Sequence, residues 1–499
     1  MSTIKSSNEH LTFNADGSGK NILFQANGTQ KASISSAGLL TSTTIDATVL
    51  TGNLPALSAA ALTAIPAGNL TGTVADARIS ALTASKLTGA LPAISGASLT
   101  NLPASGATSI GGLSDATTSG TYNVGLGTNA LTSNVSGQDN TAVGYNAAAS
   151  NLSGSTNVAF GREALYSNTT GGSNTAIGRQ ALRANISGST NTAVGLVALA
   201  ANTTAGYNTA VGSSALTAST TGVNNVAIGH SALIVNTTGS QNVAVGRNAL
   251  DASQTASYNT AIGDKALTAC TSGTQNTSIG ASSMLALTTG SLNVAVGVNS
   301  LNGVVTGDNN TALGWQSMMM ADSATANTAV GRQALRNIRG GHSNTGVGAW
   351  ALDGVSSGHS NTAVGFESLK SLSFQHSNVA VGYKAMRVMS GYQSVGIGFE
   401  AMLSNLGGGS IVAVGYRALH SNTSGYNHVA IGWDALKANT TGVTSIAIGV
   451  QSLYQCTTGS NNIGIGNGAL GTLTTGIDNT SIGVNVLAAI STASSNTAV

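Results

Sequence analysis

A phrase of five residues, Asn-Thr-Ala-Val-Gly, returns every 17 residues through the last three quarters of the chain. Two full copies are Asn191–Gly195 and Asn208–Gly212. The glycine that ends each copy, the anchor glycine, occurs in 22 units from Gly127 to Gly483, and only the interval that ends at Gly398 is one residue shorter. A period this strict is typical of stacked repeats and excludes an ordinary globular domain.

Residues around the anchor glycine indicate a strand in each unit. Position −1 always carries Val, Ile, Leu or Phe, and position −3 almost always carries Thr or Val. Because side chains alternate along a strand, these two positions share a face. We expect this face to be the interior, with Asn, Ala and Gly on the opposite face. Leu or Met at position +4 and a glycine-containing turn complete a coil, which we expect to hold two short strands and two turns.

Stacked coils of this kind predict an all-β protein, an elongated parallel β-solenoid or β-roll of 17-residue repeats. The residues that define two successive rungs are Asn191, Val194, Gly195 and Leu199, followed by Asn208, Val211, Gly212 and Leu216. One coil buries too few apolar side chains to offset the conformational entropy of its 17 residues. We therefore expect neighbouring chains to contribute, and a homotrimer is the simplest fibre symmetry. Asn at position −4 in 18 of 22 units predicts amide ladders along the rod.

The first 122 residues differ from the array. Residues 1–45 contain short alternating runs separated by turn signals and predict a small N-terminal β-meander. Residues 46–107 contain all four prolines among regularly spaced leucines, which favours an extended stalk of intertwined chains; the alternative is a flexible linker. Residues 108–122 predict a turn-rich collar, and the array occupies residues 123–499. Because Val499 lies one residue before the next expected anchor glycine, we expect the natural chain to continue with glycine.

Composition argues against several functions. A net charge of +2 provides no electrostatic case for nucleic acid binding, and no apolar run reaches the roughly 20 residues that membrane insertion needs. The 16 acidic residues are scattered over variable positions, so we expect no enzyme and no cofactor. Cys270 and Cys456 lie 11 units apart, too far to form a disulfide within one chain, and are expected to be inert thiols.

Three histidines share one position of the repeat. His342, His359 and His376 each begin the sequence His-Ser-Asn and are 17 residues apart. In a solenoid they would stack about 4.8 Å apart, and imidazoles so placed could hold a metal ion. The alternative, duplication of a surface turn, is favoured because no carboxylate or cysteine shares their register.

Position +1 carries most of the aromatic residues of the array. Exposed rings there suit contact with a receptor, for example stacking on the face of a sugar. The alternative is packing across an interface between chains, which we favour, although arginines occupy the same position in other units. The aromatic residues are Tyr145, Trp315, Phe366, Tyr383, Phe399, Tyr416 and Trp433.

The repeats resemble those of two families. Asn225–Gly229, with the sequence Asn-Val-Ala-Ile-Gly, resembles the repeats of β-roll heads in trimeric autotransporter adhesins. The closer resemblance is to bacteriophage tail fibres, in which arrays like Asn-Thr-Ala-Val-Gly-x-x-Ala-Leu are common. Leu87–Ile94 and Thr73–Ile79 are also similar to phage fibre stalk sequence.

The resemblance implies a non-catalytic homotrimeric fibre on the virion tail, assembled in the host cytoplasm. Its N-terminal region would bind a tail or baseplate protein, and its far end would contact a host-cell surface glycan or protein. A bacterial surface adhesin with a β-roll head is the main alternative. A glycan-degrading tailspike would need clustered carboxylates, and an ice-binding solenoid would need an uninterrupted outward Thr ladder.

Overall fold

The computed structural model of the protein describes residues 22–26, 29–34, 40–42, 116–117, 121–371 and 373–499. The parts within Met1–Thr100 and within Asn101–Val499 form separate units and are described in turn. The predicted stalk, residues 46–107, lies outside the described residues.

The first unit contains a three-stranded antiparallel sheet in the order β1-β2-β3. Its strands are β1 (Ile22–Ala26), β2 (Thr29–Ile34) and β3 (Leu40–Ser42). The register pairs Ile22 with Ile34, and it shifts between Phe24 and Gln25. This sheet lies inside the segment for which a meander is predicted, whereas the alternating run at residues 11–13 lies outside the described residues.

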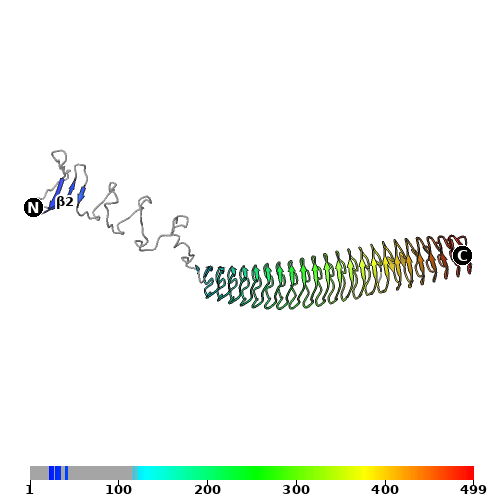
Figure 1. The fold of residues 1–499 in the computed structure, drawn as a ribbon, viewed down its shortest axis with the longest axis horizontal. Coiled ribbons are helices and arrows are strands. Elements are labelled where there is room, and N and C mark those ends of the chain that lie inside the picture. Colours follow the sequence, from blue (N-terminus) through cyan, green and yellow to red (C-terminus); the bar gives the residue numbers. More distant parts are fainter. Residues whose placement is uncertain (1–21, 27–28, 35–39, 43–115, 118–120, 372) are drawn as a thin grey trace, which may run out of the picture. The chain divides into compact units, whose positions relative to one another are not determined.

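The second unit confirms the parallel β-solenoid, with about 22 turns (Figure 1). Each unit contributes one three-residue strand at positions −3 to −1, and every strand pairs in register with the equivalent strand of the next unit. Thr209, for example, lies between Thr192 and Val226. At the start of the array, β4 (Ala116–Thr117) pairs antiparallel with β5 (Val124–Leu126).

The remaining strands of the ladder follow in chain order. They are β6 (Thr141–Val143), β7 (Val158–Phe160), β8 (Thr175–Ile177), β9 (Thr192–Val194), β10 (Thr209–Val211), β11 (Val226–Ile228), β12 (Val243–Val245), β13 (Thr260–Ile262), β14 (Thr277–Ile279), β15 (Val294–Val296), β16 (Thr311–Leu313), β17 (Thr328–Val330), β18 (Thr345–Val347), β19 (Thr362–Val364), β20 (Val379–Val381), β22 (Val395–Ile397), β24 (Val412–Val414), β25 (Val429–Ile431), β26 (Ile446–Ile448), β27 (Ile463–Ile465), β28 (Thr480–Ile482) and β29 (Thr497–Ala498).

The face of the strand that lies inside the coil is the opposite of the predicted one. Ala210 at position −2 is fully buried, as are Asn208 and Leu216, whereas Val211 and Thr209 on the other face are only partly buried. The same holds one rung earlier, where the defining residues Asn191 and Leu199 are buried and Val194 is half-buried. The prediction that positions −3 and −1 fill the interior was therefore wrong.

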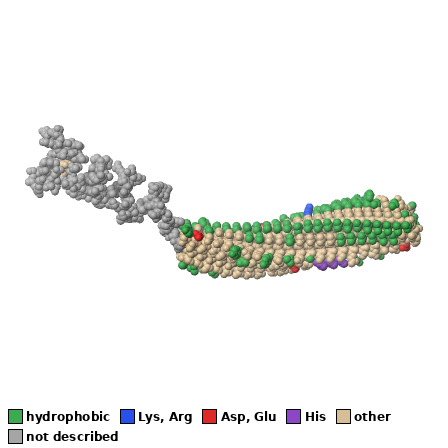
Figure 2. Space-filling view, in the orientation of Figure 1, with side chains coloured by type: hydrophobic (Ala, Val, Ile, Leu, Met, Phe, Trp, Pro, Cys, Tyr) green, Lys and Arg blue, Asp and Glu red, His purple; other side chains and the backbone are tan. Residues whose placement is uncertain are grey.

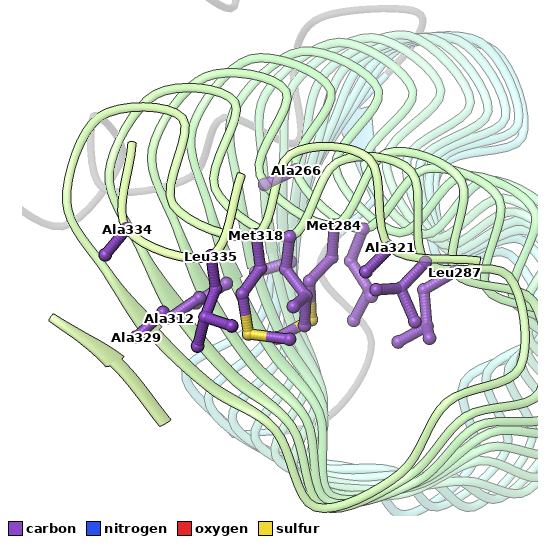
Figure 3. Close-up of a cluster of buried hydrophobic side chains, with 14 of the residues drawn as sticks. Ala266, Met284, Leu287, Ala312, Met318, Ala321, Ala329, Ala334 and Leu335 are labelled. Atoms are coloured by element: carbon purple, nitrogen blue, oxygen red, sulfur yellow. The ribbon is translucent and has the colours of Figure 1, made fainter. Parts of the chain in front are cut away.

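The narrow interior explains this arrangement. A three-residue strand followed at once by tight turns leaves room for alanine and for one or two larger apolar side chains per rung, as with Met284 and Leu287 in one rung. Figure 3 shows Met284, Met318 and Leu335 inside the coils beside Ala312 and Ala329. These five side chains are fully buried, so the larger β-branched residues are placed on the outer face.

The predicted second strand of the coil is replaced by turns in most units. Ala215 N donates to Gly212 O at 3.3 Å, and Asn202 N donates to Leu199 O at 3.3 Å. Leu199 has a φ of 51°, a left-handed conformation that interrupts a strand. Among the described residues of the array, a second strand is found only near the short interval, where β21 (Val388–Met389) pairs with β23 (Ser404–Asn405).

The predicted asparagine ladder is confirmed. Asn208 N donates to Asn191 Oδ1 at 3.0 Å, and Asn208 Nδ2 donates to Gly222 O at 2.9 Å. Each buried amide therefore satisfies two backbone groups, one of them in the next rung. A second ladder, which was not predicted, runs at position +7, where Asn185 Nδ2 donates to Asn168 Oδ1 at 2.7 Å.

The two cysteines also lie at position +7, and both are buried and free. Burial raises the pKa of Cys270 and of Cys456 to about 11. At neutral pH both groups are therefore protonated thiols, which agrees with the inert role predicted for them.

Candidate functional site

The aromatic residues at position +1 lie on the surface, and four of them form one stacked column. All seven predicted residues are at least 37% exposed. The centroids of Phe366 and Tyr383 are 5.4 Å apart, those of Tyr383 and Phe399 5.1 Å, and those of Phe399 and Tyr416 5.2 Å. The angles between successive ring planes are 8°, 11° and 10°. Each inner ring therefore covers the faces of its neighbours, and only ring edges are presented along the column.

A tryptophan ends the column on each side. Trp433 lies 6.3 Å from Tyr416 at an interplanar angle of 76°, and Trp350 lies 5.3 Å from Phe366 at 87°. Tyr416 and Trp433 line a cleft of about 250 Å³. Trp350 was missed in the sequence because it occupies position +2, one residue out of register. Ala349 fills position +1 in that unit.

The predicted residues Tyr145 and Trp315 lie outside the column, and each has a cation over its ring. Arg162 Cζ is 5.8 Å from the ring centroid of Tyr145. Arg332 Cζ lies 5.0 Å from the ring centroid of Trp315 and 4.8 Å from that of Trp350, so one guanidinium contacts both tryptophans.

Carboxylates beside the column are engaged in ion pairs. Glu367 accepts from Lys370 Nζ at 2.6 Å and from Arg387 Nε at 2.8 Å. Burial raises the pKa of Glu367, but the hydrogen bonds from Lys370 and Arg387 outweigh burial, and the pKa lies below its usual value. In a distant rung, Glu163 pairs in the same way with Arg162 and Arg183. These carboxylates link neighbouring rungs, and each is held in its charged form.

The predicted histidine stack is present. The ring centroids of His342 and His359 are 4.9 Å apart and those of His359 and His376 are 4.8 Å apart, with interplanar angles of 4° and 1°. Tyr392 extends the stack, with its ring centroid 5.9 Å from that of His376. The lone pairs of parallel rings do not converge on one point, so this arrangement does not form a metal site. Within the described ranges, no group of three or more His, Cys, Asp or Glu side chains is placed to hold a metal ion.

A fourth histidine, His428, replaces asparagine in the buried ladder at position −4. His428 Nε2 lies 2.6 Å from Gly442 O, and Ser445 N donates to His428 Nδ1 at 3.2 Å. The carbonyl needs a donor and the amide needs an acceptor, so the imidazole must be neutral with its proton on Nε2. Burial lowers the pKa of His428, which favours this neutral form.

We expect His428 to make the array sensitive to acid. Above pH 6.5, the ordinary histidine pKa, the side chain is neutral in both folded and unfolded chains. As the pH falls below that value the unfolded chain takes up the proton first, so stability decreases until the pH has passed the lower pKa of the folded state. In thermal unfolding between pH 7.5 and 5, His428→Asn should lose less stability than the wild type. An identical pH dependence in the two proteins would contradict the role of His428.

A second cleft, larger and about 610 Å³ in volume, lies over earlier rungs. It is lined by Asn299, Asn302, Gly303, Gln316, Met319, Met320, Asp322 and Arg339. Gly303 packs closely on the next rung, where an added Cβ atom would lie 2.9 Å from Met319 O. None of these residues was identified from the sequence.

Among the described residues there is no helix long and apolar enough to cross a membrane. Comparison with protein-family models, with curated proteins and with solved structures finds no match to this chain.

Proposed function

We propose that the protein is a homotrimeric tail fibre of a bacteriophage, structural and adhesive but not catalytic. It projects from the virion tail and attaches the particle to the surface of the host cell. The observation that carries this proposal is the apolar outer face of the strand ladder.

This face consists of positions −3 and −1 from β5 to β28. Ile228 is 40% exposed, Ile431 38% and Phe160 56%, and rows of hydrophobic side chains run along the array in Figure 2. Neither position carries a charged residue in any of the 22 units. Single soluble proteins rarely expose continuous apolar patches larger than a few hundred Å². A partner must therefore cover a straight apolar face as long as the array itself.

A second copy of the same chain is the partner that fits best. Identical chains present apolar rows of the same length and the same rung spacing, so side chains can interdigitate rung by rung. Three copies around one axis bury all of these faces inside the fibre, and in this proposal the aromatic residues at position +1 lie on its outer surface. The resemblance to phage fibres supports attachment of the N-terminal region to a tail or baseplate protein.

Two measurements test this proposal. Native mass spectrometry of the purified chain should give three times the 48.9 kDa of one chain. Immunogold labelling with antibodies against residues 123–499 should mark the tails of virions. Labelling of the bacterial cell surface instead would favour the alternative, a trimeric adhesin with a β-roll head, which the Val-Ala-Ile-Gly rungs also resemble. A monomer in native mass spectrometry would contradict both functions.

Ile228→Glu should dissociate the oligomer. The substitution places one carboxylate per chain in the apolar interface, and a buried unpaired charge costs several kcal/mol. Thr238→Glu is the matched control, because this exposed turn residue lies on another side of the coil. Light scattering should show a smaller mass for Ile228→Glu only; an unchanged mass would show that the strand face is not the interface.

A further inference from the structure

We propose that the cleft between Tyr416 and Trp433 is a subsite for one pyranose ring of a surface glycan. The inference rests on the proposed adhesive function and names the ligand class and its place on the fibre. The sequence favoured packing between chains for the aromatic residues at position +1, whereas the proposal takes the other interpretation, receptor contact, and limits it to one cleft.

Stacking within the column leaves few ring faces open. Phe366, Tyr383 and Phe399 are followed by rings at 5.1–5.4 Å that are nearly parallel to them, so a sugar ring cannot enter between them. At Trp433 the pattern changes, because this ring is turned 76° from Tyr416. The next residue at position +1 is Val450, which is not aromatic and cannot continue the stack.

Trp433 also differs from the other two tryptophans. Arg332 lies over the ring of Trp315, and Arg332 and Lys370 both lie over the ring of Trp350. Trp350 Nε1 already donates to Gln333 at 2.5 Å. Among the described residues, no cation lies over the ring of Trp433 and no acceptor receives its Nε1–H. Trp433 is 54% exposed, and its ring and N–H group are therefore available to a ligand.

The size and chemistry of the cleft fit a single sugar ring. Its volume of about 250 Å³ is below that of pockets for drug-sized ligands, roughly 300–1,000 Å³. Two aromatic walls suit the C–H face of a pyranose. The Trp433 Nε1–H group and the Tyr416 hydroxyl provide polar groups for the hydroxyls at the rim of that ring. Arg417, whose Cζ lies 5.8 Å from the Tyr416 ring centroid, is already paired with Glu400 at 3.7 Å. A flat nucleobase would use the walls but not this polar rim.

Saturation-transfer NMR with the full chain tests the subsite. The probes are the methyl β-pyranosides of galactose, glucose and N-acetylglucosamine, with adenosine as the competing flat ring. We expect at least one pyranoside to receive saturation, strongest on the ring protons of its C–H face. Trp433→Ala should weaken binding roughly tenfold or more, because it removes one of the two walls. Trp433→Phe should retain part of the binding.

Trp315→Ala is the matched control, since it removes a tryptophan from the same position of the repeat. Circular dichroism should show the same β-sheet signal in all variants. The proposal is overturned if no pyranoside binds, if Trp433→Ala binds as tightly as the wild type, if Trp315→Ala loses as much, or if adenosine binds better. Adhesion of labelled protein to host bacteria tests the proposed function separately: adhesion that survives Trp433→Ala rejects the subsite alone, whereas no adhesion by the wild type rejects the adhesive function.

Discussion

Gly212→Ala is expected to destabilise the array by about 3 kcal/mol. Gly212 has a φ of 135°, a conformation that residues with a side chain rarely adopt. A Cβ atom there would lie 2.6 Å from Gly229 O in the next rung. All 22 units have glycine at the anchor position, so no unit of the native protein accommodates a side chain there. Hydrogen exchange should be fastest in the rungs around residue 212.

Gly222→Ala in the same unit is the control. Gly222 lies at position +10, where an added Cβ atom would lie 2.3 Å from Gly239 O, closer than at Gly212. Its φ is not positive, however, and Ala205 and Ala256 occupy the same position in nearby rungs, so the control separates close approach from the strained φ of the anchor glycine. We expect a loss below about 1 kcal/mol in thermal and denaturant unfolding. Equal losses for the two variants would show that the anchor glycine is not special.

Asn208→Ile is expected to cost about 3 kcal/mol. It removes the side chain that bonds to Gly222 O and to Asn225 N, at 2.9 Å each. Each backbone group left buried without a partner costs about 1–3 kcal/mol. Hydrogen exchange of the Asn225 amide should rise more than that of amides several rungs away.

The reverse substitution, Ile411→Asn, is expected to stabilise the array by about 1 kcal/mol. Ile411 occupies the same buried position, where it cannot bond to Gly425 O or to His428 N as an asparagine would. The new amide would extend the ladder into the rungs that carry Ser394 and His428. If Ile411→Asn destabilises the protein as much as Asn208→Ile does, packing rather than the amide ladder controls this position.

The strict period predicted the parallel register because identical residues must lie one above another in stacked coils. Alternation showed that Thr209 and Val211 share a face, but it could not show which face is inside. Side-chain size suggested that valine fills the core. The coil is too narrow for this, and Ala210 fills it instead. The left-handed conformation of Leu216, with a φ of 51°, could not be predicted either, because leucine has no preference for this conformation.

The candidate site was predicted in position but not in geometry. The repeat places Tyr383 and Phe399 in one column. It does not give the orientation of their rings, and this orientation decides which ring faces are covered. Trp350 was not identified from the sequence because it lies one position out of register, in a turn from which its ring still reaches the column. The role of His428 could have been inferred from its place in the asparagine ladder, because an imidazole can also donate from one atom and accept at another.

A cryo-electron microscopy reconstruction of the purified chain would show whether the apolar strand faces of three chains meet at one axis. We expect three parallel copies with strands β5 to β28 facing a common axis, so that Val211 and Ile228 of each chain contact the other two. A reconstruction with a single chain, or with three chains that leave these side chains in solvent, would contradict it.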